Sequence, residues 1–210
     1  YAKVERPKPA PKFFTADEVK AMYANATPRM RLYILLGLNG GFTQIDIATL
    51  THGMIDWETG IVTRDRKKTS VPQGCKLWPT TLALLKQAAT KPNADGDNLV
   101  LVSEEGNQLV YEAVSEAGKH SKVDSIRSAF NRLKRKCKLR GKRGFKTFRK
   151  TGADAIAKQY QSEPQLVDLY LAHSANGMRK YYANQYFDEL YKATDWLATQ
   201  YGFGKIPQPK

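Results

Sequence analysis

Cysteine and histidine are scarce in this chain of 210 residues. Its two cysteines, Cys75 and Cys137, are too few for a disulfide framework, and their spacing suits no metal site. The three histidines are scattered, and no cysteine or carboxylate cluster joins them. The sequence therefore predicts free thiols in a reducing compartment, and it predicts neither a metal ion nor another cofactor.

Long apolar runs are also absent. The longest candidate, LYILLGL at residues 32–38, is far shorter than the ~20 residues that span a bilayer, and it indicates a buried helix. The N-terminus carries no secretory signal pattern. Residues 1–12, rich in proline and cations, are typical of an extended linker, and residues 13–210 then form the domain. Such a linker predicts a further domain upstream.

Acidic residues are too few to balance the basic ones. The chain has 34 Lys and Arg against 20 Asp and Glu, a net charge of +14, which favours a polyanionic partner. Residues 132–150, RLKRKCKLRGKRGFKTFRK, contain eleven cations and no carboxylate to share the charge. Phosphates are the natural counter-charge, although a flexible basic loop is the alternative reading.

Hydrophobic periodicity and turn signals predict a mostly helical α+β domain with a small antiparallel sheet. Helices are expected to begin after Thr15 and after Thr27, and GGF at 40–42 ends the second one. Residues 54–79 alternate as strands do, with turns at 58–60 and 72–74, and LVLVS at 99–103 predicts another strand. Further helices are expected at 43–50, 79–89, 123–139, 147–160, 163–173 and 185–203.

The segment LAHSANGMRKYYANQY, residues 171–186, places a histidine nine residues before a tyrosine, with two cations between them. In one continuous helix this spacing turns the chain by about 900°, so His173 and Tyr182 would face opposite ways. SANG supplies a break, so that His173 ends one helix and Tyr182 begins the next. A packing role for these side chains is the plainer alternative.

This pattern resembles the tyrosine recombinases, or phage integrase family. Their late signature is L-G-H with the nucleophilic tyrosine nine residues on, and LAHSANGMRKYY matches it. KTFRKT at 146–151 is similar to the family's H-x-L-R-H-T. GGFTQIDIATL and RKKTSVPQGCKLWP are similar to its earlier helix and its lysine-bearing hairpin. Four elements in the same order extend the resemblance over nearly everything after residue 13.

The resemblance implies a role for each matched residue. Tyr182 would be the nucleophile, Arg149 would contact the scissile phosphate, and His173 would bond a nonbridging oxygen. Lys68, with Lys67 as the competing choice, would protonate the leaving 5′ oxygen, and Lys146 stands where histidine is usual. The expected contacts to duplex DNA are Arg66, Lys67, Arg140, Lys142, Arg143, Lys150, Arg179 and Lys180.

One position departs from the family pattern. The first family arginine falls on Thr43, while Asp46 keeps the acidic position that usually supports it. The resemblance is nearer to a bacterial branch with G-F-x-x-x-D here and C-x-L-W-P after the hairpin. It therefore implies a cytoplasmic, nucleoid-associated DNA recombinase that associates with itself on DNA. A recombinase-like protein that binds DNA without cutting it, and a basic RNA-binding module, remain the alternatives.

Overall fold

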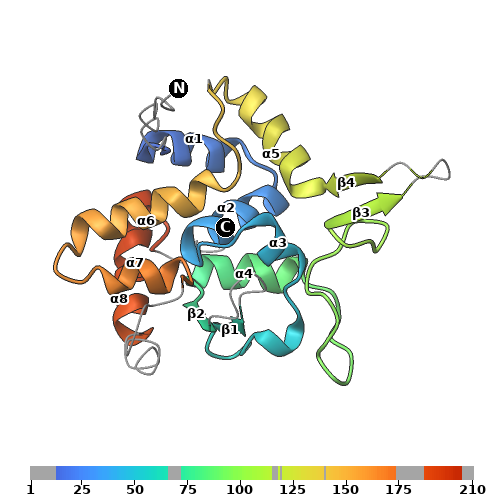
Figure 1. The fold of residues 1–210 in the computed structure, drawn as a ribbon, viewed down its shortest axis with the longest axis horizontal. Coiled ribbons are helices and arrows are strands. Elements are labelled where there is room, and N and C mark those ends of the chain that lie inside the picture. The colour runs from blue at the N-terminus through green and yellow to red at the C-terminus, as the bar shows by residue number, and fades with distance from the viewer. Residues whose placement is uncertain are drawn as a thin grey trace, which may run out of the picture.

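The computed structural model describes residues 13–65, 72–114, 118, 120–139, 141–173 and 187–204. This part of the chain is mostly helical, as the sequence predicted, and it contains two small antiparallel sheets where one was expected (Figure 1). Its elements are α1 (Ala16–Asn25), α2 (Pro28–Asn39), α3 (Gln44–Ala48), η1 (His52–Met54), β1 (Ile61–Asp65), β2 (Pro72–Lys76), α4 (Pro79–Ala88), β3 (Val110–Val114), β4 (His120–Asp124), α5 (Ser125–Lys136), α6 (Thr147–Gln159), α7 (Gln165–Tyr170) and α8 (Phe187–Tyr201).

The first two helices begin where their caps predicted. The Thr15 hydroxyl accepts from the Glu18 amide, and the Glu18 carboxylate accepts from the Thr15 amide, which closes a capping box. Thr27 caps α2, and Pro28 takes its first position. Gly41 then ends the helical course, because its φ of +61° belongs to the left-handed region that favours glycine.

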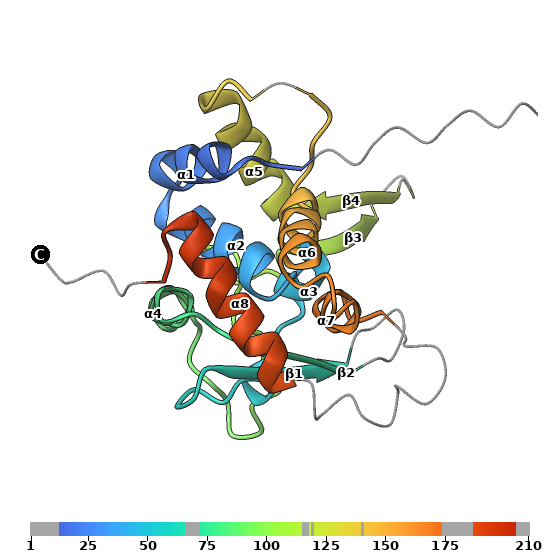
Figure 2. The ribbon, with the colours of Figure 1, turned by 90° about the vertical axis from the view of Figure 1, so that its left-hand side faces the viewer.

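α2 is the central helix, and it contacts α1, α4, α5, α6 and α8 (Figures 1 and 2). Its apolar side chains, including Leu32 and Leu35, are fully buried. Above it, four phenylalanines from three segments pack with ring centroids 4.9–6.2 Å apart, and all but the tilted Phe14–Phe148 pair meet edge to face. They are Phe14, Phe130, Phe145 and Phe148. This cluster joins α1, α5 and α6, and thereby fixes where α6 starts.

The first sheet is a hairpin of β1 and β2, and it differs from the prediction in one respect. Residues 72–74 were expected to form a turn, but they belong to β2, with Gly74 opposite Thr63. The prediction was wrong because glycine here serves packing. A Cβ on Gly74 would lie 2.9 Å from the Phe187 ring of α8, so only glycine lets the helix approach the strand. The connection at 66–71 lies outside the described residues.

The second sheet, β3 with β4, was not predicted. Val110 pairs with Asp124 and Val114 with His120 in an antiparallel ladder that projects away from α2 (Figure 1). Its residues alternate less clearly than a half-buried strand does, because much of the hairpin faces solvent. The strand predicted at 99–103 is not formed. That segment makes only isolated bridges, Thr51 with Leu99 and Val102 with Gln108.

α8 packs on its own domain. Leu190, Leu197 and Tyr201 are buried, and the Trp78 indole donates to the Thr194 carbonyl at 2.9 Å. Phe187, Tyr191 and Trp196 are half-buried, and Trp196 meets Tyr160 edge to face. Figure 2 shows α8 running from beside α1 and α4 down to the β1–β2 sheet.

Gly152 marks the tightest contact between α6 and α7. A Cβ at this position would overlap the Tyr170 hydroxyl, which donates to the Leu38 carbonyl at 2.6 Å. We therefore expect Gly152→Ala to lower the free energy of unfolding by about 2–3 kcal/mol, since a buried side chain and its hydrogen bond must move. Urea denaturation measures this. Ala155→Gly, on the same helix, removes atoms instead, so it should cost only about 1 kcal/mol.

Candidate active site

Arg149 is the centre of the candidate site. It lies in the first turn of α6 and is only 6% exposed, an unusual degree of burial for an arginine. Its Nη1 donates to the Gly41 carbonyl at 2.6 Å, and its Nη2 donates to the Leu171 carbonyl. The guanidinium therefore joins the loop after α2 to the end of α7, which are more than a hundred residues apart in sequence.

Residues 40–46, the connection after α2 together with the first turn of α3, are called the 40–46 loop here, and they contain Thr43. Thr43 caps α3, and both its amide and its hydroxyl donate to Asp46 Oδ2 at 2.7 Å. Tyr170 covers Gly41 from the α7 side, where a Cβ would lie 3.0 Å from the ring. Thr43 therefore has a structural role as a cap, and it lies two residues from the carbonyl that holds Arg149.

His173 follows α7, as the sequence predicted. Its amide donates to the Asp168 carbonyl at 2.9 Å, and its Nδ1 lies 4.0 Å from Asp168 Oδ1. Its side chain is 52% exposed, so the imidazole faces the surface beside the carbonyl that Arg149 binds. Two of the predicted catalytic residues, Arg149 and His173, therefore lie at the C-terminal end of α7: Arg149 binds the Leu171 carbonyl there, and His173 follows two residues later.

Ala172 holds that helix end in a left-handed turn. Its φ is +41°, a region that alanine adopts only at a cost in free energy, and its side chain is fully buried. The family signature that this segment resembles has glycine at this position. We expect Ala172→Gly to raise the free energy of unfolding by about 0.5–1 kcal/mol, measured by urea denaturation. A loss of stability like that expected for Ala155→Gly would contradict this reading.

The described basic residues near Arg149 fall into two groups. Lys142, Lys146 and Lys150 are exposed. Lys146 is the N-cap of α6, and Lys150 follows Arg149 in its first turn. Arg143 is instead half-buried, where it binds both carboxylate oxygens of Glu18 and lies 4.9 Å from the Phe14 ring centroid. This contact raises the pKa of Arg143 and lowers that of Glu18. Its predicted phosphate contact stays a prediction.

Several predicted site residues lie outside the described residues. They are Tyr182, Lys68, Lys67, Arg66, Arg140, Arg179 and Lys180. Their neighbours in the chain are placed, however. Residues 66–71 connect β1 to β2, and residues 174–186 connect the His173 turn to α8. The predicted nucleophile and general acid therefore belong to two segments, one between β1 and β2 and the other between α7 and α8. Both α7 and α8 contact β2. Figure 2 shows these elements together.

Sequence reasoning missed Arg64 and Gln73, which face the 40–46 loop from the hairpin. Arg64 Nη2 lies 2.8 Å from Asp46 Oδ1, and Gln73 Nε2 donates to the Gly40 carbonyl at 3.0 Å. The alternation in β1, where Val62 and Arg64 are buried and Thr63 and Asp65 are exposed, could have identified Arg64. The signal was weak because arginine is normally an outward-facing strand residue.

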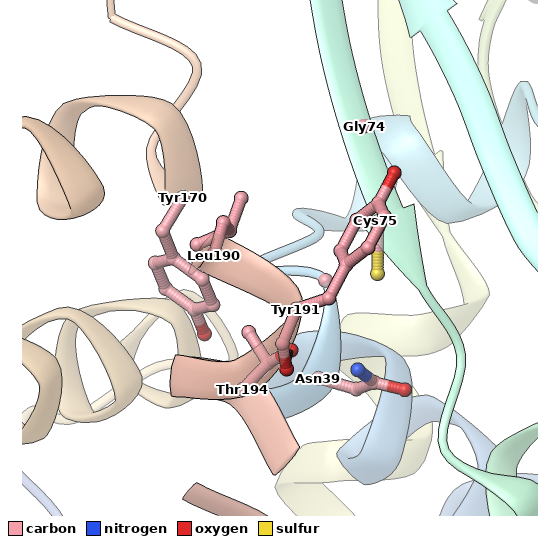
Figure 3. Close-up of a pocket in the computed structure, with 8 residues that line it drawn as sticks. Asn39, Gly74, Cys75, Tyr170, Leu190, Tyr191 and Thr194 are labelled. Atoms are coloured by element: carbon pink, nitrogen blue, oxygen red, sulfur yellow. Dashed lines mark hydrogen bonds between the residues drawn. The ribbon is translucent and has the colours of Figure 1, made fainter. Parts of the chain in front are cut away.

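A small pocket behind β2 is no substrate site. It has a volume of about 10 Å³, room for about one water, between Gly74, Cys75, Tyr170 and Tyr191 (Figure 3). Burial, with Asp195 nearby, raises the pKa of the Cys75 thiol to about 12, and burial also raises that of Tyr170. Neither group is a ready nucleophile. Among the described residues no cluster of metal ligands forms, and no helix is long and apolar enough to cross a membrane.

Solved structures of DNA recombinases share this fold. The integrase from mycobacterium phage Brujita superposes with a TM-score of 0.65 at 15% identity, over 90% of this chain and 59% of that one. XerA recombinase gives 0.61 at 14% identity, over 93% and 65%. A lambda integrase (75-356) dimer bound to a COC′ core site gives 0.59 at 17%, over 84% and 63%. The chain thus spans about three fifths of these structures.

The fold is that of a tyrosine-recombinase catalytic core, which the lambda integrase catalytic core shares over 94% of its own length. The Phage integrase family model matches residues 12–189, so the chain belongs to the phage integrase family. No curated protein sequence matches it significantly. Family membership fits the predicted functions of DNA recombination, DNA integration and DNA binding.

Proposed function

We propose that this chain is the catalytic part of a site-specific DNA recombinase that cleaves and rejoins duplex DNA through a 3′-phosphotyrosine link at Tyr182. One observation carries the proposal. In a member of the phage integrase family, Arg149 is buried and held by two backbone carbonyls beside His173. Burying an arginine costs desolvation free energy, so a buried arginine suggests that its position serves a function. A planar guanidinium fits phosphate oxygens.

The proposed chemistry assigns one task to each group. Tyr182 loses its hydroxyl proton to solvent, its oxygen attacks the scissile phosphorus, and the bond to the 5′ oxygen of the next nucleotide breaks. Lys68 gives that oxygen its proton. Arg149, His173 and Lys146 stabilise the charge that develops on the nonbridging oxygens. The phosphotyrosine conserves the bond energy, so a 5′-hydroxyl from another strand can displace Tyr182 and restore the phosphodiester.

Thr43 belongs to this proposal as the position of a missing arginine. The capping bonds that Thr43 makes to Asp46 leave a neutral side chain where the resemblance expects a cation. We propose that this is a property of a bacterial branch of the family. Loss of one preorganised donor typically slows a reaction ~10²–10³-fold, so a slow enzyme is expected unless another cation acts there.

Duplex DNA is the proposed partner, with self-association on DNA and a cytoplasmic, nucleoid-associated location. The exposed cations Lys142, Lys146 and Lys150 support DNA as the partner, since they lie around the N-terminal end of α6, which carries Arg149. The similarity of fold to a lambda integrase dimer bound to a COC′ core site supports self-association on DNA. An upstream DNA-binding domain, joined through residues 1–12, is part of the same proposal.

Covalent trapping tests the proposed function without knowledge of the target site. A pool of random-sequence duplexes, each carrying a nick so that the cleaved fragment diffuses away, is incubated with the chain. Protein that enters a denaturing gel with labelled DNA is recovered, and the linked sequences are determined. We expect a denaturation-resistant adduct on a restricted set of sequences, with the link mapped to Tyr182 by mass spectrometry.

The two rival functions predict different results. A DNA-binding protein that does not cut would retard duplex DNA in a native gel and give no adduct. An RNA-binding module would prefer RNA over duplex DNA in competition at fixed salt. Absence of any adduct from the whole pool of duplexes, or an adduct at another residue, would overturn the assignment of Tyr182.

A further inference from the structure

Arg64 makes a buried ion pair with Asp46 at the loop that holds Arg149. Its Nη2 lies 2.8 Å from Asp46 Oδ1, and its Nη1 donates to the Asp46 carbonyl at 2.9 Å. The guanidinium lies over the Phe42 ring, 5.6 Å from the centroid, and Arg64 as a whole is 5% exposed. Asp46 and Phe42, two residues of the 40–46 loop, therefore contact a cation that comes from β1.

The strand partner of Arg64 binds the other end of this loop. Arg64 pairs with Gln73 across the hairpin, so both side chains share one face of the sheet. Gln73 is 2% exposed, and its Nε2 donates to the Gly40 carbonyl at 3.0 Å. Within the described part of the chain, Arg64 Nε and Gln73 Oε1 are buried without a hydrogen-bond partner. Burying a polar atom without a hydrogen-bond partner lowers the free energy of unfolding, which indicates that these side chains have a role besides stability.

The loop connects these hairpin contacts to Arg149. Gly40 is bound by Gln73, Gly41 by Arg149 and Asp46 by Arg64, so β1, β2 and α6 all hold seven consecutive residues. A loop without Arg64 would leave the Asp46 carboxylate buried and unpaired, and its backbone would move to reach water. The Gly41 carbonyl would move with it, and the Arg149 guanidinium with that carbonyl.

We propose that Arg64 is a positioning residue for strand cleavage: it clamps Asp46, fixes the 40–46 loop, and so sets the direction of Arg149. This inference rests on the proposed recombinase function. It also accounts for the neutral Thr43, because Asp46 receives its guanidinium from β1 instead of from the loop itself. The hairpin that leads to Lys68 and the loop that holds Arg149 are thereby coupled.

The test compares adduct formation with DNA binding in Arg64 variants, on a duplex recovered by the trapping experiment. Arg64→Gln should slow adduct formation about 10²-fold, since small misplacements of a catalytic group have effects of that size. Arg64→Lys should lie between, and the Kd for the duplex should stay within about threefold. Arg31→Gln is the control, because Arg31, like Arg64, donates from its guanidinium to main-chain oxygen, here the carbonyls of Tyr23 and Ala24, which lie away from the site.

Action through Arg149 predicts that the two effects are not additive. In an Arg149→Lys background, Arg64→Gln should slow the adduct by less than about threefold further. Should Arg64→Gln fail to fold, Arg64→Met with Asp46→Asn removes both charges together, which buried pairs usually tolerate. That double variant is expected to fold and still to form the adduct about 10²-fold more slowly.

A second measurement does not depend on cleavage. The ¹⁵N–¹H signal of Arg149 Nε, assigned by its loss in Arg149→Lys, should shift in Arg64→Lys and stay in place in Arg31→Gln. An unshifted signal, or rates within twofold of the wild type, would overturn the positioning role. The role would also be overturned if Arg64→Gln slowed adduct formation as much in the Arg149→Lys background as it does in the wild type. A wild-type chain that never links to DNA would instead overturn the proposed function, and the signal would still decide the role of Arg64.

Discussion

Replacing Tyr182 with phenylalanine is expected to lower covalent DNA adduct formation by at least about 10⁴-fold, to below detection, because it removes the oxygen of the proposed nucleophile. Retardation of the same duplex in a native gel should change by less than about threefold, since a single hydroxyl contributes little to a contact dominated by cations. The measurement is a denaturing gel of labelled DNA over a time course.

Tyr181→Phe is the matched control for this prediction. Tyr181 is adjacent and chemically identical, yet it stands eight residues after His173 instead of nine. It should leave adduct formation within about threefold of the wild type, because the nine-residue spacing selects Tyr182. An adduct that persists in Tyr182→Phe and disappears in Tyr181→Phe would move the nucleophile by one position, and an adduct that persists in both would end the proposal.

Replacing Arg149 with lysine is expected to slow adduct formation about 10²–10³-fold, the effect of losing one preorganised donor. Lysine keeps the charge but has no planar fork, so it cannot bind the Gly41 and Leu171 carbonyls together and still face a phosphate. The free energy of unfolding should fall by about 1–3 kcal/mol, since a buried carbonyl loses its donor. Single-turnover trapping and urea denaturation measure the two effects.

Lys158→Ala is the control on the same helix. Lys158 is exposed and pairs with Asp154 one turn away, a contact that contributes about 0.3–0.5 kcal/mol. It should leave both the rate of adduct formation and the free energy of unfolding nearly unchanged. A rate for Arg149→Lys within tenfold of the wild type, in a protein shown to be folded, would contradict the central role given to Arg149.

The sequence predicted most helices because their signals are local. Thr15 and Thr27 are side-chain caps with acidic or proline first turns, and these contacts span three or four residues. The spacing in 125–136 places Ile126, Phe130 and Leu133 on one face, and all three are buried. The predicted turn at 72–74 was wrong for the opposite reason. Gly74 packs against Phe187, which is more than a hundred residues away in sequence.

Thus the amino-acid sequence by itself determined the helices, the basic charge, and the order of the motifs that place this chain in the phage integrase family, because caps, periodicity and net charge are properties of neighbouring residues. Only the tertiary structure decided how the site is held. It placed Arg149 between Gly41 and Leu171, and it brought Arg64 to Asp46. Such contacts join buried polar groups from distant segments, and which donors meet which carbonyls depends on how the helices and the hairpin pack.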